Sequence, residues 1–503
     1  MSQSFRVPVA GSINQRVSAT NILNSVSGYV GLGIVGGMIV GKTSGMSTKD
    51  QRFVNCFSET IVDAITGQPA VYMIKRPGFA TSITTATADL GAAILIWTGY
   101  GSGDSVISAF GATNSTIYNG TTSLGAITGV ATGITETFVS GVPTLCVTSS
   151  DNTGWYYDVP TGVMTKIVDA DFPGNAGETL AGTFAHIDGF AIVMDTTGNI
   201  WASDLNSVTS WTATSVGLAN AYPDNGIGCV RNRNLQMVFG TESLEFWQNS
   251  GLTPFPLSRV NSMTQKVGCV SATAIAQIAD TTFWCGSSPQ GGLSVFQFDT
   301  AIGRISTPEI DQILVLAGAS NISLTTIRFY GRSFVIVKAS TVALCYCIEE
   351  KMWHEWNSST APWYKIVGIS KGSTMVNFCI SNTLPSGIVY SMNPSALVFT
   401  DAGAAYTALM QLDNMELGTA NRKFWEELRI IGDQQSASSP IQLSYSDDDY
   451  QTFTTWGTLD MADPMPRATR LGSSRRRAWV LQHSDNSPMR IRLLEGRAEI
   501  GAS

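Results

Sequence analysis

The chain has 503 residues, enough for a large hydrophobic core and for more than one domain. Only 14% of the residues are charged and glycine occurs 49 times, a composition typical of an all-β protein and not of a helical bundle. The net charge of −8 argues against a surface that grips nucleic acid by releasing counterions.

Residues 17–41 form an uncharged segment near the start of the chain. Its length would admit a membrane span. Six glycines and two asparagines, Asn21 and Asn24, weaken that alternative, and no signal-peptide organisation is visible. We expect an apolar, glycine-rich insertion that packs on a neighbour, with a membrane-active segment as the alternative.

A formal match to the phosphate-binding loop spans Gly36–Thr43. In such a loop Lys42 and Thr43 would reach the nucleotide and its magnesium ion, and Asp195 could supply a magnesium ligand. The pattern requires a helix directly after the loop, but Ser44–Thr48 is a poor helix start. We therefore expect no nucleotide cofactor, and we expect a turn at Asp195.

Seven strand-rich blocks recur along the chain at intervals of about 42 to 52 residues. The most apolar strand in each block is centred at Leu95, Cys146, Ile192, Val238, Trp284, Ile336 and Phe378. Several short strands per unit at this period are typical of a propeller, whose blades bury their faces only in a closed ring. The alternative is a set of unrelated β-sandwich strands.

The expected fold class is therefore all-β. We predict a β-propeller of six or seven blades over residues 85–400. The N-terminal segment 1–84, which carries the glycine-rich insertion, and residues 401–503 would together form an additional β-rich domain.

The eight cysteines lie mostly in apolar strands, and no CxxC pair occurs. With only three histidines in the chain, a zinc site is not expected. We predict buried free thiols in a protein made in a reducing compartment.

The cluster Trp353–Trp356 contains His354 and Glu355, a pair that could perform acid–base chemistry. We expect instead that this strand closes a blade, with packed aromatic rings and hydrated polar tips. No Gly-x-Ser-x-Gly motif is present. We predict no catalytic residue, no metal site and no enzyme activity.

The segment Ser444–Phe453 is similar to the Asp-box of sialidase-like propellers, but it lacks the usual glycine. Three consecutive aspartates could bind calcium. A hydrogen-bonded hairpin turn is the expectation that we prefer.

Arg467–Trp479 is the one concentration of basic residues. Such residues with an interleaved tryptophan could hold phosphate. We favour a strand at a protein interface. The candidate contact residues are Arg470, Arg475, Arg476, Arg477 and Trp479.

Motifs at both ends resemble one known family. The first stretch, Gln51–Glu59, is followed by Lys75–Phe79, which contains a Pro-Gly-Phe sequence. The closing strands carry Ser444–Phe453 and Arg470–Trp479. Together these resemble the podovirus tail nozzle proteins, also called tail accessory or packaged-DNA stabilisation proteins. The glycine-rich stretch 17–47 departs from the pattern.

This resemblance implies a structural tail protein of a short-tailed bacteriophage, made in the cytoplasm of the host cell. Such a protein would form the nozzle below the portal and adaptor as a ring of six copies. It would contact the adaptor and a tail fibre or spike, and DNA would pass through the channel without specific binding. A carbohydrate-binding or glycosidase-like propeller is the alternative.

Overall fold

The computed structural model of the chain is almost entirely β-structure, with a single α-helix, α1 (Pro308–Ala317), among the residues that it describes. The described residues are 2–8, 30–31, 52–62, 69–97, 104–139, 141–287, 291–340, 342–358, 360, 362–371, 374–393 and 396–501. The chain forms two compact units. Unit 1 consists of Met1–Gly78, Val342–Ser359 and Ser395–Ser503, and unit 2 of Phe79–Thr341 and Thr360–Pro394.

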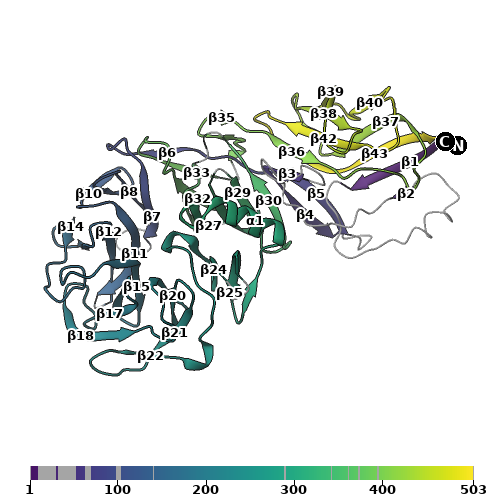
Figure 1. The fold of residues 1–503 in the computed structure, drawn as a ribbon. Coiled ribbons are helices and arrows are strands. Elements are labelled where there is room, and N and C mark those ends of the chain that lie inside the picture. The colour runs from purple at the N-terminus through teal and green to yellow at the C-terminus, as the bar shows by residue number, and fades with distance from the viewer. Residues whose placement is uncertain are drawn as a thin grey trace. The chain divides into compact units, whose positions relative to one another are not determined.

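Unit 2 contains five consecutive four-stranded antiparallel sheets, each built from neighbouring strands (Figure 1). The first two sheets are β7 (Gly91–Trp97), β8 (Ser105–Phe110), β9 (Thr116–Asn119) and β10 (Thr122–Ala126), then β11 (Ala131–Val139), β12 (Val142–Ser149), β13 (Gly154–Asp158) and β14 (Val163–Lys166). The third and fourth are β15 (Leu180–Ile187), β16 (Phe190–Asp195), β17 (Asn199–Ser203) and β18 (Trp211–Leu218), then β19 (Gly226–Asn232), β20 (Leu235–Gly240), β21 (Leu244–Asn249) and β22 (Leu257–Arg259). The fifth is β23 (Ile275–Ile278), β24 (Thr281–Ser287), β25 (Leu293–Phe298) and β26 (Ile302–Arg304).

The hairpin of β27 (Ile322–Phe329) and β28 (Arg332–Ala339) follows, and a last sheet completes the unit. That sheet contains β31 (Lys365–Lys371), β32 (Thr374–Ile380), β33 (Ile388–Met392) and β6 (Ala80–Thr84). Three short 3₁₀ turns, η2 (Asn261–Met263), η3 (Ala272–Ala274) and η4 (Ala319–Asn321), lie in the connections. Six four-stranded sheets and one hairpin make seven repeats in the described part of this unit, and the fold class predicted from the sequence is confirmed.

The ring is closed by strands from both ends of the unit. Strand β6 precedes the first sheet in sequence but pairs with β33 of the last sheet. Ile94 and Phe110 of the first sheet share a buried cluster with Ile380 and Val389 of the last. Unit 2 begins at Phe79, and β6 near its start supplies a strand of the last sheet.

The inner strands are buried on both faces. In β16, Ile192 and Met194 pack in one cluster with Val238 of β20, whereas Ala191 and Val193 pack in another with β12. Successive residues of a strand point to opposite faces, so an uninterrupted apolar run is what two covered faces require.

Hydrogen bonds between neighbouring repeats confirm the period. Thr135 donates to the carbonyl of Phe184, 49 residues away, and Thr326 donates to the carbonyl of Gln277, also 49 residues away. Of the seven predicted centres, Leu95 alone lies on the first strand of its sheet, β7, whereas the other six lie on second strands. The equivalent second strand is β8, so the first interval was overestimated.

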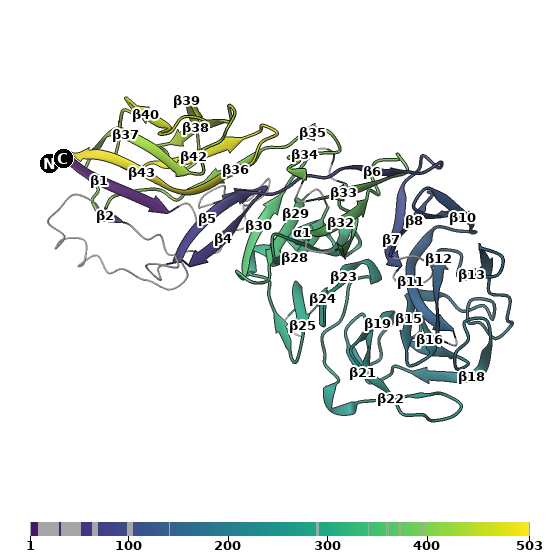
Figure 2. The same ribbon diagram turned by 180° about the vertical axis from the view of Figure 1, so that it is seen from behind.

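Unit 1 is a β-sandwich (Figure 2). Its first sheet contains β1 (Ser2–Pro8), β2 (Val30–Gly31), β4 (Cys56–Val62), β5 (Pro69–Lys75), β37 (Lys423–Gly432), β40 (Arg467–Thr469), β41 (Ser473–Ser474) and β43 (Arg490–Ile500). The strands of its second sheet that lie in unit 1 are β29 (Val342–Cys347), β30 (Met352–Trp356), β3 (Arg52–Val54), β36 (Ala408–Gln411), β42 (Ala478–His483), β38 (Pro440–Ser446) and β39 (Thr454–Asp460). A separate small pair is formed by β34 (Thr400–Asp401) and β35 (Ala404–Ala405).

One core joins the two sheets of unit 1. Leu428 of β37 and Leu494 of β43 pack in the same buried cluster as Leu443 of β38 and Leu481 of β42. Residues 342–359, which fall inside the predicted propeller range, are part of compact unit 1. In this unit β30 pairs with β3, through Glu355 and Val54.

Candidate assembly surface and buried networks

The basic segment Arg467–Trp479 lies on unit 1, where it forms β40, β41 and the start of β42. Arg470 and Arg475 are exposed, and the side chain of Arg476 is 42% exposed. Arg475 donates to the carbonyl of Ala420 at 2.9 Å, and Arg476 lies 3.8 Å from Asp449. Within the part of the chain that the structure describes, Arg470 forms no hydrogen bond or ion pair. These three guanidinium groups are available to a partner.

The other two candidates lie in the interior of unit 1. Arg477 is 1% exposed and forms a bidentate ion pair with Asp447, at 2.6 and 2.7 Å. Its guanidinium also lies 3.8 Å from the ring centre of Tyr445 and 5.2 Å from that of Trp479, which is itself fully buried. The side chains of Arg477 and Trp479 therefore pack in the sandwich core, and of the five candidates only Arg470, Arg475 and Arg476 reach the surface.

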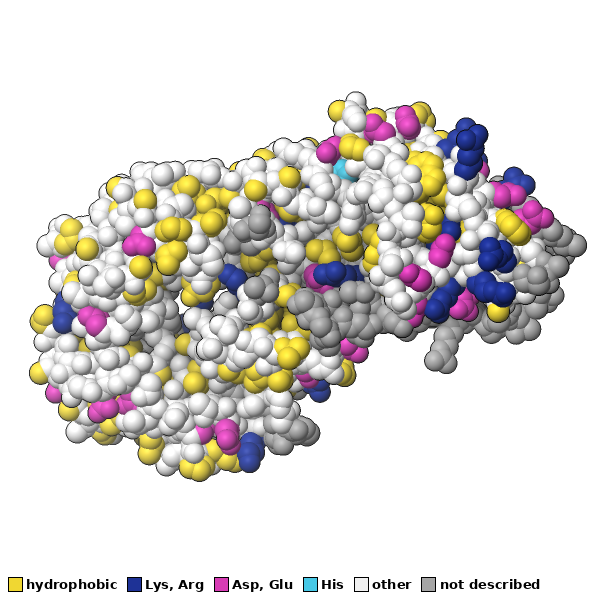
Figure 3. Space-filling view, turned by 45° about the horizontal axis from the view of Figure 1, so that its top comes forward, with side chains coloured by type: hydrophobic (Ala, Val, Ile, Leu, Met, Phe, Trp, Pro, Cys, Tyr) yellow, Lys and Arg dark blue, Asp and Glu magenta, His cyan; other side chains and the backbone are white. Residues whose placement is uncertain are grey.

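An exposed apolar side chain lies on the strand that pairs with this basic segment. Phe424 of β37 is 48% exposed and pairs in register with Ser473, between Arg470 and Arg475 in the sequence. Exposed aromatic rings beside arginines are typical of protein interfaces. We call Arg470, Arg475, Arg476 and Phe424 the basic face of unit 1; Figure 3 shows several Lys and Arg side chains over this unit.

The aspartate-rich segment is a hydrogen-bonded turn, as predicted. Asp448 accepts from the backbone N–H of Thr452 at 2.9 Å, from the hydroxyl of the same residue and from that of Ser446. The hydrogen bonds from Thr452 and Ser446 lower the pKa of Asp448 to about 2. Asp447 pairs with Arg477, and Asp449 accepts from Asn414 at 3.0 Å. Each of the three carboxylates therefore has a structural partner.

The cluster Trp353–Trp356 forms β30 and is buried throughout. The expectation of hydrated polar tips was wrong. Glu355 is 2% exposed and accepts two hydrogen bonds from Arg52, at 2.8 and 3.1 Å. His354 is fully buried, and burial lowers the pKa of its imidazole to about 3. A neutral buried ring of this kind is not placed for acid–base catalysis.

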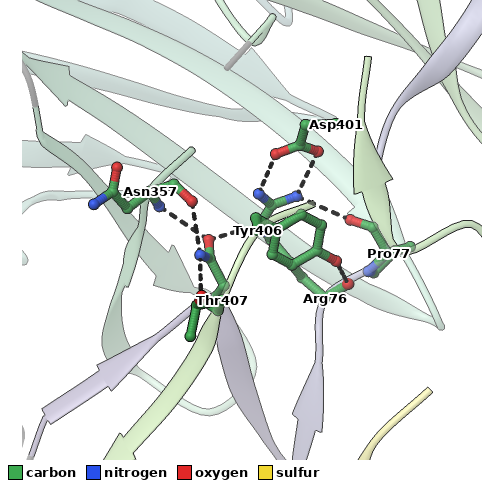
Figure 4. A network of polar contacts seen from close by, with 7 residues as sticks. Arg76, Pro77, Asn357, Asp401, Tyr406 and Thr407 are labelled. Carbon is green, nitrogen blue, oxygen red and sulfur yellow. Dashed lines mark hydrogen bonds and ion pairs between the residues drawn. The ribbon is translucent and has the colours of Figure 1, made fainter. Parts of the chain in front are cut away.

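The N-terminal motif residues form a buried network in unit 1 (Figure 4). Arg76 is fully buried and binds both carboxylate oxygens of Asp401, at 3.0 and 2.5 Å. Its guanidinium also lies 3.9 Å from the ring centre of Tyr406, whose hydroxyl donates to the carbonyl of Arg76. This pair could not be predicted from the sequence, because its partners are 325 positions apart.

Asn55 connects Arg76 to two other strand ends. It has a positive φ of 56°, and its side-chain oxygen accepts from Arg76 at 2.9 Å and from the backbone N–H of Asn357 at 2.9 Å. Its side-chain nitrogen donates to the carbonyls of Asn357 and Thr407. Asparagine tolerates this backbone conformation and offers both donor and acceptor, so the motif residue serves the fold.

Gly78 of the Pro-Gly-Phe sequence lies against β34. A Cβ atom at this position would lie 2.1 Å from the carbonyl oxygen of Thr400. The glycine is therefore required by close backbone approach.

Asp195 is fully buried in a turn, as predicted. It accepts from the backbone N–H groups of Thr197 and Asn199, at 2.9 and 3.0 Å, and from the indole of Trp201 at 3.1 Å. The loop Gly36–Thr43 lies outside the described residues, as does most of the segment 17–41, in which only Val30 and Gly31 are described.

All eight cysteines are buried free thiols, as predicted. Among the described residues no group of three or more potential metal ligands occurs. None of the helices that the structure describes is long and apolar enough to cross a membrane.

The two units thus define a β-propeller protein with an attached β-sandwich. Residues 112–377 match the sequence model of the family described as Bacteriophage P22 Gp10, beta-propeller. The match covers more than half of the chain, and the chain belongs to this family. Membership supports a structural role in a phage tail, and hence a place in the virion.

Two solved structures are similar to this chain at low identity. The structure of U3-55K has a TM-score of 0.39 and 7% identity, covering 63% of this chain and 100% of that chain. The crystal structure of RRP9 WD40 repeats has a TM-score of 0.39 and 8% identity, covering 64% and 99%. A search of curated protein sequences finds no match.

Proposed function

We propose that the protein forms the nozzle of a short-tailed phage, as a ring of six copies below the portal and adaptor. In this position it retains the packaged DNA and later serves as the exit channel. The observation that carries the proposal is membership of the Gp10 family over residues 112–377. Its role is structural, and no catalytic step is part of it.

The construction of the two units supports this role. A nozzle under pressure from packaged DNA must keep its shape. In unit 2 the blade ring is closed by β6, and in unit 1 Arg76 and Asn55 join strand ends from distant parts of the sequence. Closed β-rings and satisfied buried networks make such units rigid.

The net negative charge of the chain also supports the nozzle role. The chain has 38 acidic and 30 basic residues. A net negative protein repels DNA, so a channel made from it would let DNA slide without binding it. The basic face of unit 1 is our candidate for the contact with a neighbouring copy or with the adaptor, because identical copies in a ring need a heterologous interface.

Electron microscopy of the phage particle tests the proposal. We expect six copies of the seven-repeat propeller around the tail axis below the adaptor, and particles that lack the protein should lose their DNA. A single copy, or a position away from the axis with normal DNA retention, would contradict the nozzle role.

A further inference from the structure

A cavity of about 340 Å³ lies in unit 2. It is found where the first strands of four neighbouring sheets end. These strands are β11, β15, β19 and β23, which belong to four consecutive blades. Figure 3 shows that the propeller unit is hollowed near its middle on the face in view. A volume of this size is in the range of small-molecule sites.

Equivalent positions of the four blades line this cavity. The hairpins that follow the strands begin at the pairs Val139↔Val142, Ile187↔Phe190, Asn232↔Leu235 and Ile278↔Thr281. The residue one position before each hairpin is Phe138, His186, Arg231 or Gln277, and all four line the cavity. Because the blades end in register, these side chains converge on one space.

Three of the four side chains keep polar atoms without a protein partner among the described residues. Arg231 uses only its Nε, which donates to the carbonyl of Arg233 at 2.7 Å, so both terminal nitrogens are free. Gln277 uses its nitrogen for the carbonyl of Arg231 and for Thr282, which leaves its oxygen as an acceptor. His186 accepts from the N–H of Gly189 at Nε2, at 3.3 Å, so the neutral ring carries its proton on Nδ1.

The fourth side chain supplies an apolar wall. Phe138 is 42% exposed, and its ring centre lies 5.7 Å from that of His186. Glu136, two residues earlier on β11, also lines the cavity. The cavity therefore combines a guanidinium fork, a carboxylate, an amide oxygen, an N–H donor and one aromatic face.

We propose that this cavity binds an acidic sugar unit, such as a uronic acid of a surface polysaccharide. The guanidinium of Arg231 fits a carboxylate with two parallel hydrogen bonds. The side-chain oxygen of Gln277 offers an acceptor for a hydroxyl group, and the ring of Phe138 suits the apolar face of a pyranose. A neutral sugar would leave the arginine without its anion, and a simple carboxylate would leave the Gln277 oxygen and the aromatic wall unused. Nozzle assembly requires none of these groups, so this inference goes beyond the proposed function.

Calorimetric titration of the purified full chain tests it with three probes: methyl glucuronide, methyl glucoside and acetate. We expect the glucuronide to bind, and the glucoside and acetate to bind at least about 10-fold more weakly, because each lacks one set of contacts. Arg231→Gln should weaken glucuronide binding by at least about 10-fold.

Arg233→Gln is the matched control. Arg233 is an exposed arginine in the same hairpin, pairs with Asp299 at 2.7 Å and does not line the cavity. It should bind the glucuronide like the wild type, and equal thermal unfolding curves would show that both variants are folded. Absence of glucuronide binding, equal binding of acetate or of the neutral glucoside, or an equal loss in Arg233→Gln would each overturn the proposal.

Discussion

Arg76 and Asp401 form an ion pair in which both side chains are fully buried. Arg76 lies near the end of the first chain segment of unit 1, and Asp401 lies near the start of the third. The pair therefore joins two segments of this unit that are 325 positions apart in the sequence.

The variant Asp401→Asn should strongly destabilise unit 1. It leaves the Arg76 charge buried without its counter-ion, which costs about 3–5 kcal/mol. Urea unfolding followed by circular dichroism measures the loss. The control is Asp433→Asn, at an exposed carboxylate 3.2 Å from Arg490, which should cost less than about 1 kcal/mol. Equal effects of the two substitutions would contradict the role given to the buried pair.

Lys75, the residue before Arg76, predicts a pH dependence of stability. Burial, together with repulsion from Arg76, lowers its pKa from 10.5 to about 7. Its ammonium group contacts His483 at 3.3 Å and the carbonyl of Asp485 at 2.5 Å, and no carboxylate directly within the described residues. Between pH 7 and 10.5 the unfolded chain keeps a proton that the folded chain has released, so stability rises with pH across this window.

The variant Lys75→Met should remove this rise, which has a slope of up to about 1.4 kcal/mol per pH unit. Unfolding free energies at several pH values between 7 and 10 measure it in the wild type and the variant. Lys266→Met, at an exposed lysine, serves as the control and should keep the wild-type slope. If the slope of Lys75→Met equals that of the wild type, Lys75 is not the titrating group.

A third prediction concerns the blade core. Trp284 of β24 is fully buried, and its ring centre lies 5.5 Å from that of Phe239 and 5.7 Å from that of Phe296. Trp284→Asp should unfold unit 2, because an unpaired buried charge costs several kcal/mol, to an order of magnitude. The indole nitrogen has no hydrogen-bond partner among the described residues, so Trp284→Phe removes only volume and should leave a folded protein. Cooperative thermal unfolding of Trp284→Asp at the wild-type temperature would contradict this placement.

The regular spacing of apolar strands made the propeller predictable from the sequence. The buried polar networks could not be predicted, because their partner residues lie far apart in the sequence. An apolar run such as Phe190–Met194 indicates a strand covered on both faces whatever its neighbours are. In the first block the predicted centre, Leu95, lies on the wrong strand. The most apolar strand of that sheet is β7, which is its first strand, whereas the equivalent second strand is β8. Arg477 lies in a run of arginines that looks solvent-exposed, and its burial depends on Asp447, 30 residues away. The cavity at Arg231 arises from four blades that only the closed ring brings together.

The last prediction concerns assembly through the basic face. Arg470, Arg475 and Arg476 offer guanidinium groups that suit a facing carboxylate. Replacing all three with Glu should set like charges against that partner, at a cost of about 2–5 kcal/mol per interface, repeated around the ring. Arg477 is left unchanged because its loss would unfold the sandwich. The expected result is particles without the protein that leak their packaged DNA.

Complementation of a deletion phage with the triple variant measures this effect as the fraction of DNA-filled particles. The triple Lys variant is the matched control, since it keeps the charges and loses only the fork geometry, and it should assemble better than the Glu variant. Thermal unfolding of the purified Glu variant separates assembly from folding. Exposed arginines with weak partners, such as Arg476 at 3.8 Å from Asp449, contribute little to stability, so its unfolding temperature should match the wild type. A folded Glu variant that is incorporated normally and gives full heads would mean that the basic face is a solvated surface and that neighbours meet elsewhere.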